Sequence, residues 1–221
     1  MKVVRILWVI CVAIALLTVA WAGDDGPLQS WGSITRFHLD VPLRTPQPVT
    51  NLSTVDFQNF SLALYPTDSS GSNGMVPGDP SKGLPLLVPM RQGRYVGTNT
   101  TTGAIEFDLI KSELIRLPKA PGQTLAMVSG VLYSGSNKQN CTGVVQLFES
   151  NHNQLVVTDQ ISYDCRGGGS AIYDAHKRRL KIQSARYAAG DKPCCPSLFD
   201  KVEFKMDGES MKATNIHLEQ E

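Results

Sequence analysis

The sequence lacks an excess of charge of either sign. Its 221 residues include 21 Lys and Arg and 20 Asp and Glu, which gives a formal net charge of +1 at pH 7. Proteins that bind nucleic acid or an anionic membrane through bulk electrostatics usually carry a clear basic surplus. The balance therefore points away from nucleic acid as a partner, and it gives no reason to expect binding to a membrane surface.

The short motifs that mark common catalytic and metal sites are also missing. Nucleophilic hydrolysis is often marked by Gly-x-Ser-x-Gly, and the nearest stretches, Gly169-Ser170-Ala171 and Ser129-Gly130, lack the full pattern. Histidine metal sites usually show close pairing such as His-Glu-x-x-His. The four histidines lie far apart in the chain, at His38, His152, His176 and His217. We therefore expect no catalytic residue, metal ligand or cofactor, and we favour a non-catalytic role.

Long apolar runs are absent except at the N-terminus. Lys2 and Arg5 precede an apolar run from Ile6 to Ala20, and Ala20-Trp21-Ala22 places small residues around a cleavage point. This pattern is typical of a secretory signal peptide over residues 1–22, although an uncleaved anchor remains the alternative. Loss of Lys2 and Arg5 lowers the 21 basic residues to 19, against 20 acidic ones. We expect a secreted or periplasmic protein, attached to a membrane only if the leader is retained.

Cysteine is scarce, with five in the chain, and Cys11 lies inside the leader. The remaining residues, an even number, are Cys141, Cys165, Cys194 and Cys195. In an oxidising compartment such a set predicts two disulfides rather than free thiols or metal ligands. A zinc site is disfavoured because its cysteines usually lie two to four residues apart.

Adjacency constrains how Cys194 and Cys195 pair. Neighbouring Cα atoms lie about 3.8 Å apart, whereas disulfides usually span roughly 4.4 to 6.8 Å. A vicinal bridge is therefore strained, and Pro196 favours an extended backbone that turns successive side chains to opposite sides. We favour a crossed arrangement in which the pair bonds to Cys141 and Cys165. A Cys141–Cys165 bridge with a vicinal bridge remains the alternative.

Period-two alternation of apolar and polar residues is the main structural signal. It is clearest at Ile105, Phe107 and Leu109, and such alternation predicts half-buried strands. Asp207-Gly208 separates two more runs of this kind and predicts a hairpin turn between 201–206 and 210–216. Further strands are expected at 123–134, 143–149, 154–163 and 170–173, and around Leu180 and Ile182.

These signals predict a mainly β fold (α+β possible), with an antiparallel sheet as a meander, barrel or sandwich and at most one or two short helices. The helix candidate is Phe107–Leu117, where a long strand is the alternative. We expect residues 23–65 to form an N-terminal extended arm and first strands, and 66–84 an exposed flexible loop. Residues 85–221 should form a disulfide-supported β domain, and 23–221 together one domain.

Two polar segments have a plain structural interpretation. His176-Lys177-Arg178-Arg179-Leu180-Lys181 spans a turn and the start of a strand, and we interpret it as a solvated rim, with anion binding as the alternative. Cys165-Arg166-Gly167-Gly168-Gly169 has the glycines of a phosphate cradle but no following helix, so we interpret it as a loose connection.

The segment "YAAGDKPCCPS" (187–197), followed by "KVEFKMDGESM" (201–211), resembles the end of exported bacterial proteins of the LppP/LprE lipoprotein family. The segment "VDFQNFSLALY" (55–65) is similar to an N-terminal signature of related exported proteins of unknown function. The resemblance implies a bacterial cell-envelope location and a mainly β domain, and it supplies no activity, cofactor or catalytic residue. The chain departs from the lipoprotein pattern because no lipobox cysteine ends its leader.

Together these features predict an exported cell-envelope protein with a non-catalytic binding or structural role, whose partner is an unknown envelope or extracellular ligand. The rival hypothesis is a thiol-redox or metal-binding protein that uses Cys194 and Cys195. Redox sites usually separate their cysteines, as in Cys-x-x-Cys, so the adjacent pair favours the structural role.

Overall fold

The structure is a computed structural model, and it describes residues 28–43, 45, 48–67, 76, 84–99, 103–117, 124–135, 140–192, 195–207 and 210–219. Its strands are β1 (Leu28–Trp31), β2 (Ile34–Leu43), β3 (Ser61–Leu64), β4 (Leu86–Pro89), β5 (Arg94–Asn99), β6 (Gly103–Arg116), β7 (Thr124–Ser134), β8 (Asn140–Asn151), β9 (Gln154–Asp164), β10 (Ser170–Asp174), β11 (Arg179–Arg186), β12 (Leu198–Asp207) and β13 (Ser210–His217). Short 3₁₀ turns lie at η1 (Leu52–Thr54), η2 (Phe57–Asn59) and η5 (Arg166–Gly168). All strand pairs in these ranges are antiparallel, which confirms the predicted mainly β class.

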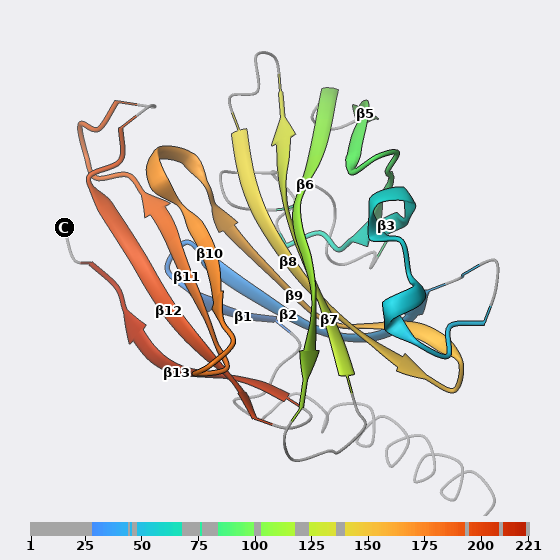
Figure 1. The fold of residues 1–221 in the computed structure, drawn as a ribbon. Helices are drawn as coiled ribbons and strands as arrows, with labels where there is room; N and C mark the ends of the chain where they lie inside the picture. The colour runs from blue at the N-terminus through green and yellow to red at the C-terminus, as the bar shows by residue number, and fades with distance from the viewer. Residues whose placement is uncertain are drawn as a thin grey trace, which may run out of the picture.

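The strands form three sheets that stack as layers (Figure 1). The central sheet has seven strands in the order β1-β2-β9-β8-β7-β6-β5, and it ends at β1 and β5 without closing on itself. The outer sheet has four strands in the order β10-β11-β12-β13, and it lies on the left of the central sheet in Figure 1. The pair β3-β4, with η1 and η2, forms a smaller layer on the right, which we call the β3–β4 layer.

The central sheet is apolar on both faces because each face packs against one of the other layers. Along β8, Val144 and Phe148 belong to the core under the β3–β4 layer, whereas Val145 and Leu147 belong to the core under the outer sheet. Strands buried on both sides lose the alternation of apolar and polar residues that marks a half-buried strand. This double burial explains the almost continuous buried runs of β8 and β9.

Two buried glutamines attach the β3–β4 layer to the central sheet. Gln160 Nε2 donates to the Tyr65 carbonyl at 2.7 Å, and the Tyr65 N–H donates to Gln160 Oε1 at 2.8 Å. Gln146 Nε2 donates to the Ala63 carbonyl at 2.7 Å and to Gln160 Oε1 at 3.0 Å. These side chains therefore satisfy backbone groups of the layer that have no water to bond.

Asp200 of β12 makes the corresponding connection between the outer sheet and the central sheet. The Ser33 N–H and Oγ donate to Asp200 Oδ2 at 2.9 and 2.8 Å, and Asp200 is fully buried. Gly32 has φ +58°, and a Cβ there would lie 2.2 Å from Asp200 Oδ2. Ser184 Oγ donates to the Ser33 carbonyl at 3.1 Å. The β1–β2 turn is thus held by the two middle strands of the outer sheet.

Most predicted strands are confirmed. The segments expected at 123–134, 143–149, 154–163 and 170–173 correspond to β7, β8, β9 and β10. The expected C-terminal hairpin is formed by β12 and β13, with Met206 opposite Met211. Gly208 in its turn lies outside the described residues.

The helix alternative at Phe107–Leu117 is wrong, because β6 runs through Gly103–Arg116. A register shift lies between Leu109 and Lys111, and Ile110 beside it is 68% exposed. Phe107 faces the β3–β4 layer, whereas Ile115 beyond the shift faces the outer sheet. One extra residue in a strand changes the face that its side chains occupy, and in β6 this change imitates the spacing of a helix.

The loop expected at 66–84 is corrected at the positions that the structure describes. Val76 is fully buried in the core under the β3–β4 layer, and Thr67 is buried as well. The Val76 N–H donates to Thr67 Oγ1 at 3.1 Å, and the Thr67 N–H donates to the Val76 carbonyl. A single apolar residue in a polar stretch therefore contributes to the core. Residues 68–75 and 77–83 lie outside the described ranges.

The substitution Gln160→Leu tests the glutamine attachment. The leucine side chain leaves the N–H and carbonyl of Tyr65 buried without their partner, so we expect the free energy of unfolding to fall by about 2 to 4 kcal/mol. Urea denaturation followed by circular dichroism measures this change. Gln154→Leu, at an exposed position of the same strand, is the matched control and should change stability by less than about 0.5 kcal/mol. Equal effects of the two substitutions would contradict the attachment.

Candidate functional site

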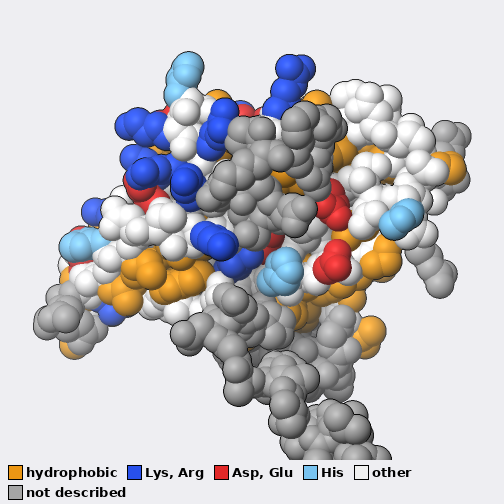
Figure 2. All heavy atoms as spheres, turned by 90° about the horizontal axis from the view of Figure 1, so that it is seen from below, with side chains coloured by type: hydrophobic (Ala, Val, Ile, Leu, Met, Phe, Trp, Pro, Cys, Tyr) orange, Lys and Arg blue, Asp and Glu red, His pale blue; other side chains and the backbone are white. Residues whose placement is uncertain are grey.

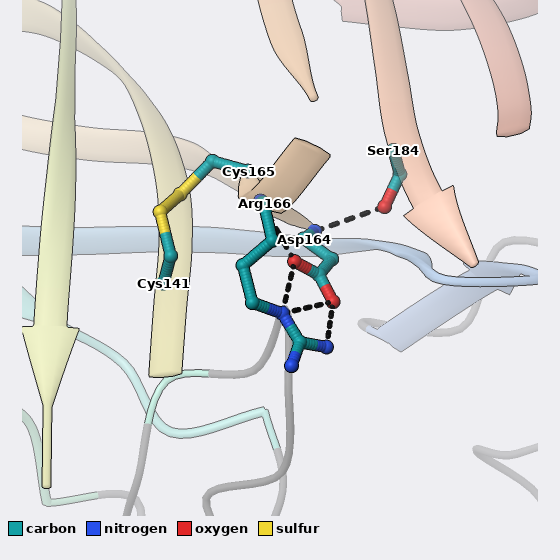
Figure 3. The surroundings of a disulfide bond; sticks show 5 residues. All are labelled: Cys141, Asp164, Cys165, Arg166 and Ser184. Atoms are coloured by element: carbon teal, nitrogen blue, oxygen red, sulfur yellow. Dashed lines mark hydrogen bonds and ion pairs between the residues drawn. A yellow bond between two sulfur atoms is a disulfide. The ribbon is translucent and has the colours of Figure 1, made fainter. Parts of the chain in front are cut away.

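Cys141 and Cys165 form a disulfide with a Cα–Cα distance of 5.5 Å (Figure 3). The register of β8 and β9 pairs Thr142 with Asp164, so the two cysteines lie opposite each other at the end of the hairpin. The crossed arrangement that the sequence favoured is therefore wrong. The strain of a vicinal bridge favours the crossed arrangement, but the register of β8 and β9 brings Cys141 and Cys165 together.

The described part of the Cys-Cys-Pro segment, Cys195 and Pro196, lies between β11 and β12. Cys195 is also held in a disulfide, while Cys194, and with it the connectivity of this bridge and the direction of its side chain, lies outside the described residues. Asp191 Oδ2 accepts hydrogen bonds from Ala188 N, Ser197 N and Ser197 Oγ at 2.8 to 2.9 Å. These bonds lower the pKa of Asp191, and they tie together the two ends of the segment.

A buried ion pair stands beside the first disulfide (Figure 3). Arg166 Nε donates to both carboxylate oxygens of Asp164, at 3.0 and 3.1 Å, and its Nη2 forms an ion pair with Oδ2. The guanidinium also lies 4.3 Å from the centre of the Tyr187 ring. The Ser184 Oγ accepts a hydrogen bond from the Asp164 N–H at 2.9 Å. This cluster links the end of β9 to β11, which makes it a structural junction.

His38 is the histidine with a defined acidic partner. Its Nδ1 lies 3.3 Å from Asp159 Oδ1, and Arg36 Nε donates to the same oxygen at 2.8 Å. Arg36 Nη1 donates to Gln29 Oε1 at 3.1 Å. The hydrogen bond to Asp159 raises the pKa of His38, while partial burial opposes this change. The set holds β1, β2 and β9 together at one edge of the central sheet.

The described residues contain neither a side-chain cluster suited to a metal ion nor a membrane-spanning helix. No group of three or more His, Cys, Asp or Glu side chains converges there as a cation site would require. Within the same ranges, no helix has the length and apolar character needed to span a bilayer.

A broad polar feature is the surface of the outer sheet that points away from the central sheet. Its residues alternate with Leu180, Ile182, Val202 and Phe204, which lie in the core beneath. Strand register arranges them in three rows, Ser170-Gln183-Lys201-His217, Ile172-Lys181-Glu203-Asn215 and Asp174-Arg179-Lys205-Lys212. We call this surface the basic face. Figure 2 shows Lys and Arg side chains gathered on the left, the side on which the outer sheet lies in Figure 1.

A groove of about 300 Å³ crosses the basic face. Its lining combines hydroxyl, amide, cationic and aliphatic groups from all four strands: Ser170, Ile172, Lys181, Ile182, Gln183, Lys201, Val202, Glu203, Asn215 and His217. Ile172 is 60% exposed and gives the groove an apolar side. The volume is at the lower end of the range for small-ligand sites.

Glu203 organises the charges in the middle of the basic face. Lys181 Nζ lies 3.2 Å from Glu203 Oε1, and Arg179 Nη1 donates to Oε2 at 2.8 Å. The hydrogen bonds from Lys181 and Arg179 lower the pKa of Glu203. Lys201 Nζ is 3.9 Å from Glu219 Oε1. Arg179, Lys181 and Lys201 thus each have a carboxylate neighbour, and in the three described rows of the basic face the cations outnumber the carboxylates.

Residues 176–181, which the sequence predicts to form a solvated rim, belong to two different parts of the structure. Residues 176–178 lie in the turn between β10 and β11, whereas Arg179 and Lys181 belong to the basic face. A signal for this face was present in the alternation of Lys201, Glu203 and Lys205 with apolar residues. Sequence alone could not show that the charged positions of separate strands would lie side by side.

Comparisons with protein-family models, with curated proteins and with solved structures found no match to this chain.

Removing the first disulfide tests its contribution to stability. For Cys141→Ser/Cys165→Ser we expect the free energy of unfolding to fall by about 3 to 4 kcal/mol, because the bridge closes a loop with a sequence separation of 24. Urea denaturation without reductant measures the loss. Cys141→Ala/Cys165→Ala should give the same result, which separates the bridge from the effect of the new hydroxyls. A loss below about 1 kcal/mol in both variants would contradict the chain-entropy account.

The pair His38–Asp159 predicts a pH-dependent stability. Because folding raises the pKa of His38, its contribution is fully present below the ordinary pKa near 6.5 and is lost as the pH rises through the folded value. The difference in unfolding free energy between wild type and His38→Gln should therefore shrink between about pH 6 and pH 8. Urea titrations at several pH values measure it. His152→Gln, which lies in an exposed turn, is the control, and a flat difference for His38→Gln would refute the coupling.

Proposed function

We propose that the protein is an exported, non-catalytic binding module of the bacterial cell envelope, secreted or periplasmic, and that the basic face is its binding surface. Export is supported by the leader pattern of residues 1–22, and by disulfides at Cys141–Cys165 and at Cys195, which persist in oxidising compartments. The resemblance of the Cys-Cys-Pro segment to envelope lipoproteins agrees with this location.

The observation that carries the binding role is the contrast between the two surfaces of the outer sheet. Its inner surface packs against the central sheet through Leu180, Ile182, Val202 and Phe204, while its outer surface combines a groove, exposed cations and an exposed isoleucine. A surface that serves solubility alone needs scattered charges of both signs. Here hydroxyl, amide and cationic groups converge with an aliphatic side chain in one concavity, which is the composition of a ligand site.

Export is tested by fusing alkaline phosphatase after residue 221. The phosphatase is active only after transfer to an oxidising compartment, because its own disulfides must form. We expect activity from the full chain and none from a matched fusion that begins at residue 23. Equal activity of the two fusions would overturn export.

The binding surface is tested by sedimenting the mature chain with envelope material isolated from the organism that carries the gene. Asn215→Trp fills the groove, and we expect it to reduce the bound fraction at least fivefold. Val96→Trp places the same ring on exposed strand β5 of the central sheet and should bind as wild type does. Failure of the wild-type protein to sediment, or equal binding of both variants, would overturn the assignment of the basic face.

A further inference from the structure

We propose that the groove of the basic face binds an acidic polysaccharide, a linear glycan that carries carboxylate groups. This inference rests on the proposed function, since it names the ligand of the same surface. The first observation that supports it is the positive charge of the basic face. The whole chain is nearly neutral, yet the basic face holds Arg179, Lys181, Lys201, Lys205 and Lys212, together with His217. Carboxylates on or beside it include Asp174, Glu203 and Glu219 among the side chains that the structure describes.

The spacing of these cations suits an extended polyanion. Neighbouring strands of a sheet lie about 4.8 Å apart, and alternate residues along a strand lie about 6.6 Å apart. Lys181, Lys201 and Lys205 belong to different rows on adjacent strands, so their charges form a lattice rather than a single cluster. A chain with acidic groups repeated along its length meets several of them at once. A small anion meets only one or two.

The lining of the groove distinguishes a glycan from other polyanions. Ser170, Gln183 and Asn215 supply hydroxyl and amide groups that match sugar hydroxyls. Ile172 offers an aliphatic surface to the C–H face of a sugar ring. Glu203, held by Lys181 and Arg179, presents carboxylate oxygens that accept hydrogen bonds from hydroxyl donors.

Nucleic acid, an anionic membrane and a protein partner each fit this lining less well than a glycan does. Single-stranded nucleic acid is usually bound by stacking on aromatic rings, most often those of Phe, Tyr and Trp, and none of these three is among the described residues that line the groove, where His217 is the one ring. An anionic membrane favours a surface with apolar side chains that insert between lipids, whereas Glu203 lies in the centre of the basic face. Protein partners favour an aromatic-rich centre of the interface, whereas the described residues that line the groove include no Phe, Tyr or Trp.

The test measures binding of the mature chain to polygalacturonate by isothermal titration calorimetry at low and high salt. We expect binding that weakens with salt, and no binding to neutral dextran. Lys181→Gln/Lys201→Gln should weaken binding at least tenfold. Arg91→Gln/Lys111→Gln removes two exposed charges from outside the outer sheet and should change binding less than twofold. Lys201→Gln/His217→Gln, which leaves Glu203 and Lys181 paired, should also weaken binding and guards against a folding defect in the first variant.

Three competing probes decide the identity of the ligand. Polyglutamate, vesicles that contain phosphatidylglycerol and a single-stranded oligonucleotide should each bind at least tenfold more weakly than polygalacturonate. Equal or tighter binding of any of them would overturn the glycan assignment. No binding of polygalacturonate, with sedimentation on envelope material intact, would overturn the assignment and leave the proposed function standing. Loss of sedimentation as well would overturn the proposed function itself.

Discussion

Burial of β8 and β9 between two layers is the constraint on which the rest of the fold depends. Val144 and Phe148 point to one side of β8, and Val145 and Leu147 point to the other. A sheet with two apolar faces requires two covers, so the outer sheet and the β3–β4 layer are both necessary parts of one structure. The other strands either extend the central sheet around β8 and β9 or belong to one of these covers.

Apolar contact alone does not position the covers, because hydrophobic burial has no direction. Buried hydrogen bonds are directional, and they determine where each cover lies on the central sheet. Gln160 bonds both backbone groups of Tyr65 on one side of the central sheet, and Asp200 bonds Ser33 on the other. A buried polar group that loses its partner is costly, so each layer is favoured in the position at which Gln160 and Asp200 make these bonds. The two junctions thus select a single arrangement of layers.

The same arrangement leaves the basic face of the outer sheet outside the packing between the three sheets. Inward-facing positions of the outer sheet pack against the central sheet. The alternate positions face outward, do not take part in this packing, and carry cations, amides and hydroxyls. The Cys141–Cys165 disulfide and the Asp164–Arg166 pair hold the end of β9 beside β11. These contacts attach the outer sheet to the central sheet, so the basic face is held in place before any ligand arrives, and the proposed binding would cost little ordering entropy.

The sequence by itself determined the mainly β class, most strand segments and the C-terminal hairpin, because alternation and turn residues act over neighbouring positions. It could not distinguish strand from helix at Phe107–Leu117, where a register shift in β6 changes the face of the apolar residues. Nor could it place Val76 in the core. Only the tertiary structure decided that Cys141 bonds Cys165 and that the charged rows of four strands form one face. Both outcomes depend on strand register, which pairs residues that are distant in sequence.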